Sequence, residues 1–284
     1  MLTRSSAPAA AGSLALLVSG AVTAPALAQE AMYTAAATMP SPGTVLVREQ
    51  FHWYRYDDNP ADGSNRTDRY EFLSTLYIGI IRDLSLNVDL PFDVVDRRFP
   101  APGTDDLDSA ITRVDFTFKY RFFREDTGGI DTRRAALLFG TALSTDDDDD
   151  GIVANPHLGA VYTEVFGRHG VNFEIRYTLN TGGDPADNFG GQGPDDALAY
   201  NAAYLYRFFP DAYTSDSTGA WYATLELNGL YETGGDSELR FSPGIMFEGR
   251  VFGFEIMGQL PVYQDLDDRP DLEFAVGVGF RLLF

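Results

Sequence analysis

Charged residues stand at alternate positions in several segments of the chain, a spacing suited to electrostatic chemistry. Arg113, Asp115, Lys119 and Arg121 share one parity between residues 111 and 122. In an extended strand, residues of one parity point to one face, so acidic and basic side chains would lie side by side there. The side chains of such a face can form ion pairs with one another or attract a passing ion. This chemistry is electrostatic and involves no covalent bond.

If the strands close into a barrel, these charges line its interior. Two compatible interpretations stay open: a ladder of ion pairs that holds the barrel together, and the wall of a narrow, selective pore. Arginines such as Arg121, Arg207 and Arg240 would attract a carboxylate or a phenolate, whereas acidic mouths would favour cations. The residues predicted to line the interior are Arg48, His52, Glu71, Asp89, Arg113, Asp115, Lys119, Arg121, Glu174, Arg176, Arg207, Glu226, Glu238, Arg240, Glu255, Glu273 and Arg281.

An acidic run invites a calcium interpretation. Asp146, Asp148 and Asp150 precede Gly151, like the opening of an EF-hand loop, but His157 stands where that loop needs a bidentate Glu. The flanks also favour strands, so the EF-hand is rejected. A loose divalent-cation site that bridges lipopolysaccharide phosphates and a solvated acidic loop are the two remaining readings.

The three histidines, His52, His157 and His169, are the candidates for a catalytic base. An enzyme of the hydrolytic barrel class needs a Ser or water activated by His. His52 shares its predicted strand with no inward Ser, His157 lies at the base of the acidic loop, and His169 lies in a predicted periplasmic turn. The chain also has no Gly-x-Ser-x-Gly motif. We therefore predict no catalytic residue and no enzymatic activity, and no motif requires a cofactor.

The elements that position these residues are strands with alternating apolar and polar positions. In one of them Val171, Phe173 and Ile175 alternate with Asn172 and Glu174. Sustained alternation over 9–14 residues fits tilted strands of a closed transmembrane barrel. We predict an all-β, antiparallel up-and-down barrel of about twelve strands near residues 44–56, 69–80, 84–95, 111–122, 134–144, 156–166, 171–180, 197–208, 220–232, 238–248, 251–263 and 271–284.

The predicted connections alternate in length. They are short after the second, sixth and tenth strands, whereas the intervening loops hold most of the acidic residues, and turns of about ten residues follow the fourth and eighth. Short turns are typical of the periplasmic side and long loops of the outside. Pro91 and Pro261 predict bulges, because proline donates no ladder hydrogen bond. Aromatic residues gather at strand ends, as in Tyr120-Arg121-Phe122-Phe123 and Tyr206-Arg207-Phe208-Phe209, and predict interfacial belts.

The N-terminus predicts export. Residues 1–28 combine Arg4, an apolar stretch and Ala26-Leu27-Ala28, the pattern of a cleaved signal peptide. We expect a short periplasmic segment over 29–43 and the barrel over 44–284. Without residues 1–28, 20 basic residues face 42 acidic ones, which argues against nucleic acid as a partner. There is no cysteine, so no disulfide or thiolate metal site is available.

The last segment, Leu272 to Phe284, is apolar at alternate positions and ends on Phe. It resembles the closing strand of bacterial outer-membrane barrels, and the resemblance implies recognition by the barrel-assembly machinery through Phe284. Together with Lys119-Tyr120-Arg121-Phe122, Phe241-Ser242-Pro243-Gly244-Ile245 and Gln259-Leu260-Pro261-Val262, it makes the chain similar to the outer-membrane transporter family named for the MetA pathway of phenol degradation.

That resemblance implies passive uptake of small, aromatic or hydrophobic compounds, and it transfers no binding residue. The sequence therefore predicts a narrow channel or transporter for small solutes in the bacterial outer membrane, in contact with its lipid and lipopolysaccharide. The alternatives are a non-conducting structural or surface barrel and, further off, a lipid-modifying enzyme. The interior charges would select solutes by size and charge.

Overall fold

The computed structural model describes residues 30–101, 103–111, 113–127, 130–146, 151–182, 187–214 and 217–284. The predicted signal peptide, residues 1–28, lies outside these ranges. Within them the chain forms β1 (Val45–Tyr56), β2 (Arg66–Ile81), β3 (Leu84–Arg98), β4 (Asp106–Ala110), β5 (Arg113–Thr127), β6 (Asp131–Asp146), β7 (Gly151–Phe166), β8 (His169–Thr178), β9 (Ala197–Phe209), β10 (Gly219–Glu232), β11 (Ser237–Gly249), β12 (Phe252–Asp265) and β13 (Leu272–Leu283).

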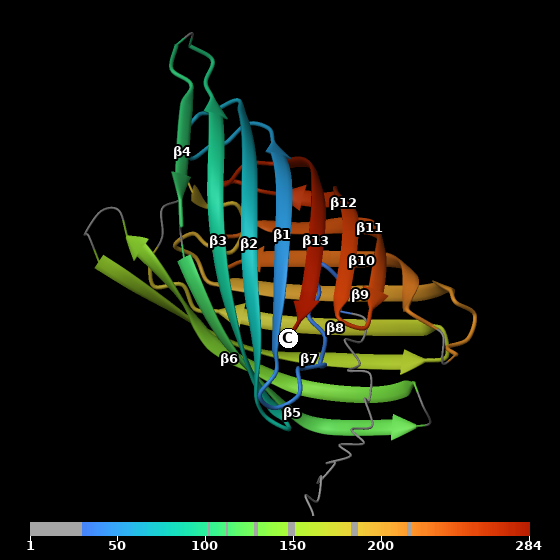
Figure 1. The fold of residues 1–284 in the computed structure, drawn as a ribbon. Coiled ribbons are helices and arrows are strands. Elements are labelled where there is room, and N and C mark those ends of the chain that lie inside the picture. The colour runs from blue at the N-terminus through green and yellow to red at the C-terminus, as the bar shows by residue number, and fades with distance from the viewer. Residues whose placement is uncertain are drawn as a thin grey trace, which may run out of the picture.

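These strands form one antiparallel sheet that closes on itself. Strands adjacent in sequence pair with one another, except that β4 and β5 both pair with β3. The first and last strands also pair, from Leu46↔Leu283 to Tyr56↔Leu272. Figure 1 shows the ring of strands, in which β4 stands above β5 as its outer continuation. β4 and β5 therefore occupy one place in the wall, and the predicted twelve-stranded barrel is confirmed.

Alternation places polar side chains inside and apolar ones outside. On β8, Phe173, Ile175 and Tyr177 are exposed on the outer wall, whereas Asn172 and Glu174 are buried in the interior. Closure of the sheet pairs the backbone groups of neighbouring strands, and the alternation offers an apolar surface around the barrel. In the described ranges no helix is long and apolar enough to cross a membrane.

The two predicted proline bulges turn out differently. At Pro261 the β11–β12 register shifts, with Leu239 opposite Tyr263 and Arg240 opposite Pro261, so that bulge is confirmed. On the β2 side, Pro91 keeps a regular pairing with Leu73. On the other side, β3 pairs with β5 up to Asp89↔Asp115 and with β4 from Asp93↔Ala110, so the register shifts by one residue across Pro91. Proline has no backbone N–H to donate, and Pro91 lies where the neighbour of β3 changes from β5 to β4.

The connections follow the predicted alternation with one exception. β2–β3, β7–β8 and β11–β12 are joined by two residues each, at 82–83, 167–168 and 250–251. The predicted long turn after the fourth strand was wrong, because β5 continues to Thr127 and β6 begins at Asp131. Both strands extend beyond the apolar stretch and pair through Arg124↔Arg134 and Thr127↔Asp131.

Candidate functional site

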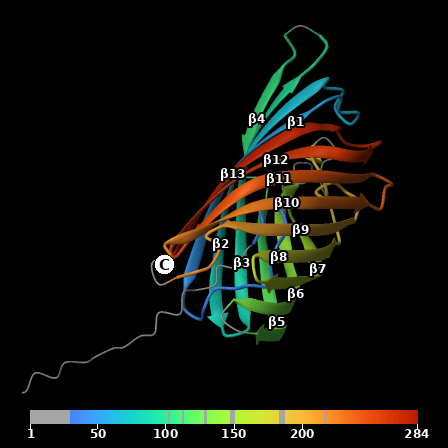
Figure 2. The same cartoon turned by 90° about the vertical axis from the view of Figure 1, so that its right-hand side faces the viewer.

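The N-terminal segment, residues 30–43, forms no strand, and its residues 30–38 lie in the interior of the barrel. Figures 1 and 2 show this segment as a blue coil among the strands. Ala31, Ala36 and Ala37 are buried, each at 1% exposure or less. The periplasmic assignment of residues 29–43 stays a prediction. Residues 31–38 contact inward-facing side chains of the barrel, as their hydrogen bonds show.

Glu226 on β10 is the main acceptor for this segment. Its carboxylate accepts hydrogen bonds from the backbone N–H of Met32 at 2.9 Å and of Tyr33 at 3.2 Å, and from the hydroxyl of Thr34 at 2.6 Å. Glu226 is fully buried. A carboxylate in such a place is stabilised by several donors, and here the N-terminal segment supplies three of them.

Other interior side chains bind further main-chain groups of the segment. The N–H of Ala35 donates to Glu174 at 3.0 Å, and the N–H of Ala37 donates to the Thr163 hydroxyl at 2.8 Å. Lys119 donates to the carbonyl of Ala36 at 2.6 Å. Because this segment pairs with no strand, its buried N–H and C=O groups need hydrogen bonds with side chains instead.

Two arginines hold the beginning of the segment. Arg48 donates to the Ala31 carbonyl at 2.9 Å, and Arg281 donates to the Glu30 carbonyl at 2.5 Å. Both arginines also bind the Glu255 carboxylate, with N–O distances of 2.8 and 2.7 Å. The predicted ion-pair ladder therefore exists in this region, and it binds a peptide as well.

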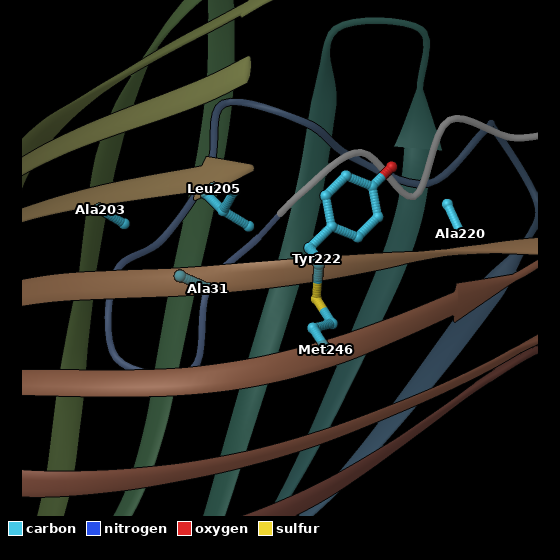
Figure 3. Packing of buried hydrophobic residues seen from close by; sticks show 6 residues of the cluster. All are labelled: Ala31, Ala203, Leu205, Ala220, Tyr222 and Met246. Atoms are coloured by element: carbon cyan, nitrogen blue, oxygen red, sulfur yellow. The ribbon is translucent and has the colours of Figure 1, made fainter. Parts of the chain in front are cut away.

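Packing follows the same path. Ala31 lies among Ala203, Leu205, Ala220, Tyr222 and Met246, which project inward from β9, β10 and β11 (Figure 3). At Gly277 on β13, a Cβ atom would lie 2.5 Å from the Met32 sulfur and 2.8 Å from the His52 ring. Small residues on the wall thus make room for the segment, and the lumen is narrowed by it.

A second charged network lies on the interior face of β1, β2 and β3. His52 Nδ1 lies 2.9 Å from Glu71, Arg69 bridges Glu71 and Asp93 at 2.5 and 2.8 Å, and all four side chains are buried. Sequence reasoning named His52 and Glu71 but missed Arg69 and Asp93. Both could have been found by parity, because Arg69 shares the parity of Glu71 on β2 and Asp93 shares that of Asp89 on β3.

Residues 187–193 of the β8–β9 loop fold over the long-loop end of the interior. Phe189 is buried, with its ring centroid 5.2 Å from that of Tyr56 and 5.1 Å from the Arg69 guanidinium carbon. Glu232 accepts hydrogen bonds from the N–H of Gly191 and from the Asn188 amide, both at 3.0 Å. These contacts fix the loop in its inward position.

Buried Arg269 anchors the neighbouring loops. It binds Glu232 at 2.6 Å, Glu238 at 3.1 Å and Asp236 at 3.5 Å. Just beyond it, burial and the nearby Asp57 carboxylate raise the pKa of Asp271 above its ordinary value. This acidic end therefore begins to lose negative charge at a higher pH than isolated carboxyls would.

Three predicted residues lie away from the centre of the interior. Arg121 binds Asp83 at 2.7 Å in the short β2–β3 turn, and Arg207 lies 4.2 Å from the Tyr213 ring centroid near the β9–β10 turn. Glu273 is exposed, so its interior assignment is corrected. A register shift opposite Arg55 and Tyr56 turns Leu272 inward in its place.

The remaining predicted residues line the interior in two groups. Glu238 and Arg240 form an ion pair at 2.8 Å, and Asp89 accepts a hydrogen bond from Thr75 at 2.6 Å. Arg113, Asp115 and Arg176 line a cavity of about 270 Å³ beneath the β8–β9 loop. Of the weak metal candidates, Asp148 and Asp150 lie outside the described residues, as does the side chain of Asp146.

His157 forms a contact that invites comparison with a catalytic pair. Its Nε2 lies 2.9 Å from the Thr117 hydroxyl, which donates to Asp115, also at 2.9 Å. With the hydroxyl proton directed at Asp115, the histidine donates to the Thr117 oxygen. A general base would have to accept that proton, so the arrangement is that of a structural histidine.

Comparisons with known proteins agree with this architecture. No family model and no curated protein matches the chain. Among solved structures, it is similar to the COG4313 outer membrane channel from Pseudomonas putida F1, with a TM-score of 0.58 and 15% identity, covering 90% of this chain and 100% of that chain.

Weaker structural likeness extends to two autotransporter domains. The β domain of Bordetella BrkA has a TM-score of 0.48 and 12% identity, over 86% of this chain and 100% of that chain. The translocator domain of NalP from Neisseria meningitidis has a TM-score of 0.46 and 13% identity, over 86% and 90%. At such identities the likeness shows the fold alone, and membership of the MetA-pathway family stays a prediction.

Proposed function

We propose that this protein is an outer-membrane channel for the passive movement of small solutes, closed in the described state by its own N-terminal segment. The observation that carries the proposal is the polar interior of a closed barrel, in which residues 31–38 are bound largely through main-chain groups. A charged interior suits a pore that selects by size and charge. A segment bound by hydrogen bonds can leave without unfolding the wall.

The outer wall supports a place in a membrane. Large apolar side chains such as Phe173, Ile175, Leu227 and Ile256 are exposed on it, and a soluble protein rarely exposes so continuous an apolar surface. Lipid and the lipopolysaccharide of the outer leaflet are therefore the proposed partners. Export by the predicted signal peptide, residues 1–28, belongs to the same proposal.

The C-terminus supports assembly as a closing strand. Phe284 donates its N–H to the Val45 carbonyl at 2.9 Å, and Val45 donates back to Phe284 at 3.3 Å. The last residue thus completes the seam between the first and last strands. Recognition of this strand by the barrel-assembly machinery is proposed on that basis.

The solutes we propose are small aromatic or hydrophobic compounds, as the family resemblance implied. Aromatic side chains face the same space as the charges: Tyr54, Tyr56 and Phe189 form one cluster with Leu272 and Val95. Such surfaces offer apolar contact beside hydrogen-bonding groups, a usual composition of small-molecule sites.

The test is single-channel conductance of the refolded protein in planar bilayers, with the reversal potential measured under a salt gradient. Discrete openings that become more frequent in Glu226→Gln support the proposal, because the substitution weakens three hydrogen bonds to the segment. Glu164→Gln is the matched control, since Glu164 lies on the outer face and binds Arg133. Silence of both folded variants would contradict it.

The occupied interior also favours the second candidate, a non-conducting structural or surface barrel. In that case the N-terminal segment stays in the interior permanently and stabilises the barrel, as buried side chains stabilise a protein core. The same recordings distinguish the two: a structural barrel stays silent after Glu226→Gln and loses stability instead. No hydrolytic role is proposed, because the contacts of His52 and His157 do not activate a nucleophile.

A further inference from the structure

The barrel interior holds a cavity of about 270 Å³ beneath the β8–β9 loop. Large side chains from β1, β2 and β3, such as Tyr54, Arg69 and Arg97, fill the interior beside it. Small wall residues leave room for the cavity on β6 and β9, at Ala142, Ser144, Ala197 and Ala199. This volume is close to the lower end of small-ligand sites.

One side of the cavity is apolar. Val95 from β3, Phe189 and Gly190 from the β8–β9 loop and Leu230 from β10 line it. At Gly190 a Cβ atom would lie 3.1 Å from Leu230, so the loop approaches the wall closely there. Phe189 is fixed by Tyr56 and Arg69, which gives the cavity a rigid aromatic surface.

The other side presents two guanidinium groups. Within the described ranges Arg113 forms no hydrogen bond or ion pair, and Arg176 has one ion pair, to Glu174 at 3.5 Å. Four acidic residues also line the cavity. Two of them are compensated, because Asp93 binds Arg69 at 2.8 Å and Asp187 binds Arg97. Asp108 is exposed to solvent. Asp115 accepts a hydrogen bond from Thr117. Donor capacity therefore remains on the two arginines.

We propose that this cavity binds a small organic anion with an apolar body, such as an aromatic carboxylate or phenolate. Its anionic oxygens face Arg113 and Arg176, and its ring lies against Phe189 and Leu230. Arginine suits this role because its planar donors match a carboxylate and its charge persists at all relevant pH values. The inference rests on the proposed function, for which it names the solute class.

The test is isothermal titration calorimetry on the full-length refolded protein in detergent, with benzoate as the probe. Benzyl alcohol keeps the ring without the charge, benzylamine reverses the charge, and acetate removes the ring. We expect benzoate to bind more tightly than all three. Equal binding of benzoate and benzyl alcohol, or preference for benzylamine, would overturn the proposal.

Variants assign the contacts. Arg113→Gln and Arg176→Gln should each weaken benzoate binding by about tenfold or more, because each removes a charge-assisted hydrogen bond. Arg113→Lys should retain part of the affinity, and Phe189→Ala should weaken benzoate while leaving acetate unchanged. Arg98→Gln is the matched control, since Arg98 is half exposed and pairs with Asp96. Unchanged affinity in both folded cavity variants would refute the site.

Binding and conduction can fail separately. Benzoate binding without any channel activity would support the anion site and contradict the proposed channel. Conductance that benzoate does not alter, together with no calorimetric signal, would leave the channel and remove the anion site. The folded state of each variant is checked by the faster gel migration that an unheated barrel shows.

Discussion

At the scale of the residue, the interior charges have more than one role. Parity correctly predicted that Arg48, Lys119 and Glu226 face inward. It could not predict that they bind a peptide, because their partners lie up to 194 positions away and are backbone groups. Ala35, Ala36 and Ala37 carry no side-chain signal for such contacts. Alternation along a strand therefore predicts which side chains face the interior, but it does not predict what those side chains contact.

Glu49 gives a prediction about the outer wall. It is exposed between the apolar outward residues Val47 and Phe51, and accepts a hydrogen bond from Ser74 at 2.6 Å. If lipid surrounds this wall, Glu49→Leu should raise the free energy of unfolding by roughly 1–2 kcal/mol, since it removes a carboxylate from hydrocarbon.

Equilibrium urea unfolding in lipid vesicles measures this change, with Glu164→Leu near the short-turn end as the control expected to have a smaller effect. A decrease in stability for Glu49→Leu would indicate that the wall around Glu49 does not contact lipid.

At the scale of the element, alternation predicted the strands well because lipid-facing and interior positions must differ in polarity. It failed where local geometry departs from a period of two. The register shift at Leu272 moved Glu273 off the interior, and at Pro91 the neighbour of β3 changes from β5 to β4 with a shift of one residue. A single extra residue in a strand inverts the parity that follows, and sequence alone does not locate it.

The β8–β9 loop offers a prediction at this scale. Glu232→Ala removes the acceptor of Asn188 and Gly191 and leaves buried Arg269 with fewer partners. We expect the loop around residues 187–193 to become sensitive to protease while the barrel stays folded, because the wall strands do not depend on these bonds. Limited proteolysis with mass spectrometry measures it.

Glu125→Ala is the control for the loop prediction, since Glu125 is exposed near the β5–β6 turn at the opposite end. Equal protease resistance of the loop in the Glu232 variant and in the wild type would show that Phe189 packing alone holds it.

At the scale of the whole molecule, a closed barrel encloses a polar space that two of its own segments restrict. The N-terminal segment occupies the interior beside β1, β5, β8, β10 and β13, and the β8–β9 loop covers the long-loop end. The barrel itself was predictable from period and turn spacing. The occupied interior was not, because residues 30–43 have no periodicity and their fixed path exists only within the closed wall.

The most direct test of the account is to lock the N-terminal segment in place. The chain has no cysteine, and Ala37 shares a buried cluster with Ala136 on β6, so Ala37→Cys with Ala136→Cys introduces the sole disulfide. Single-channel recordings of this variant should be silent when oxidised and show openings after reduction, because only then can the segment leave the lumen. Identical recordings from the cross-linked and reduced protein would contradict the account.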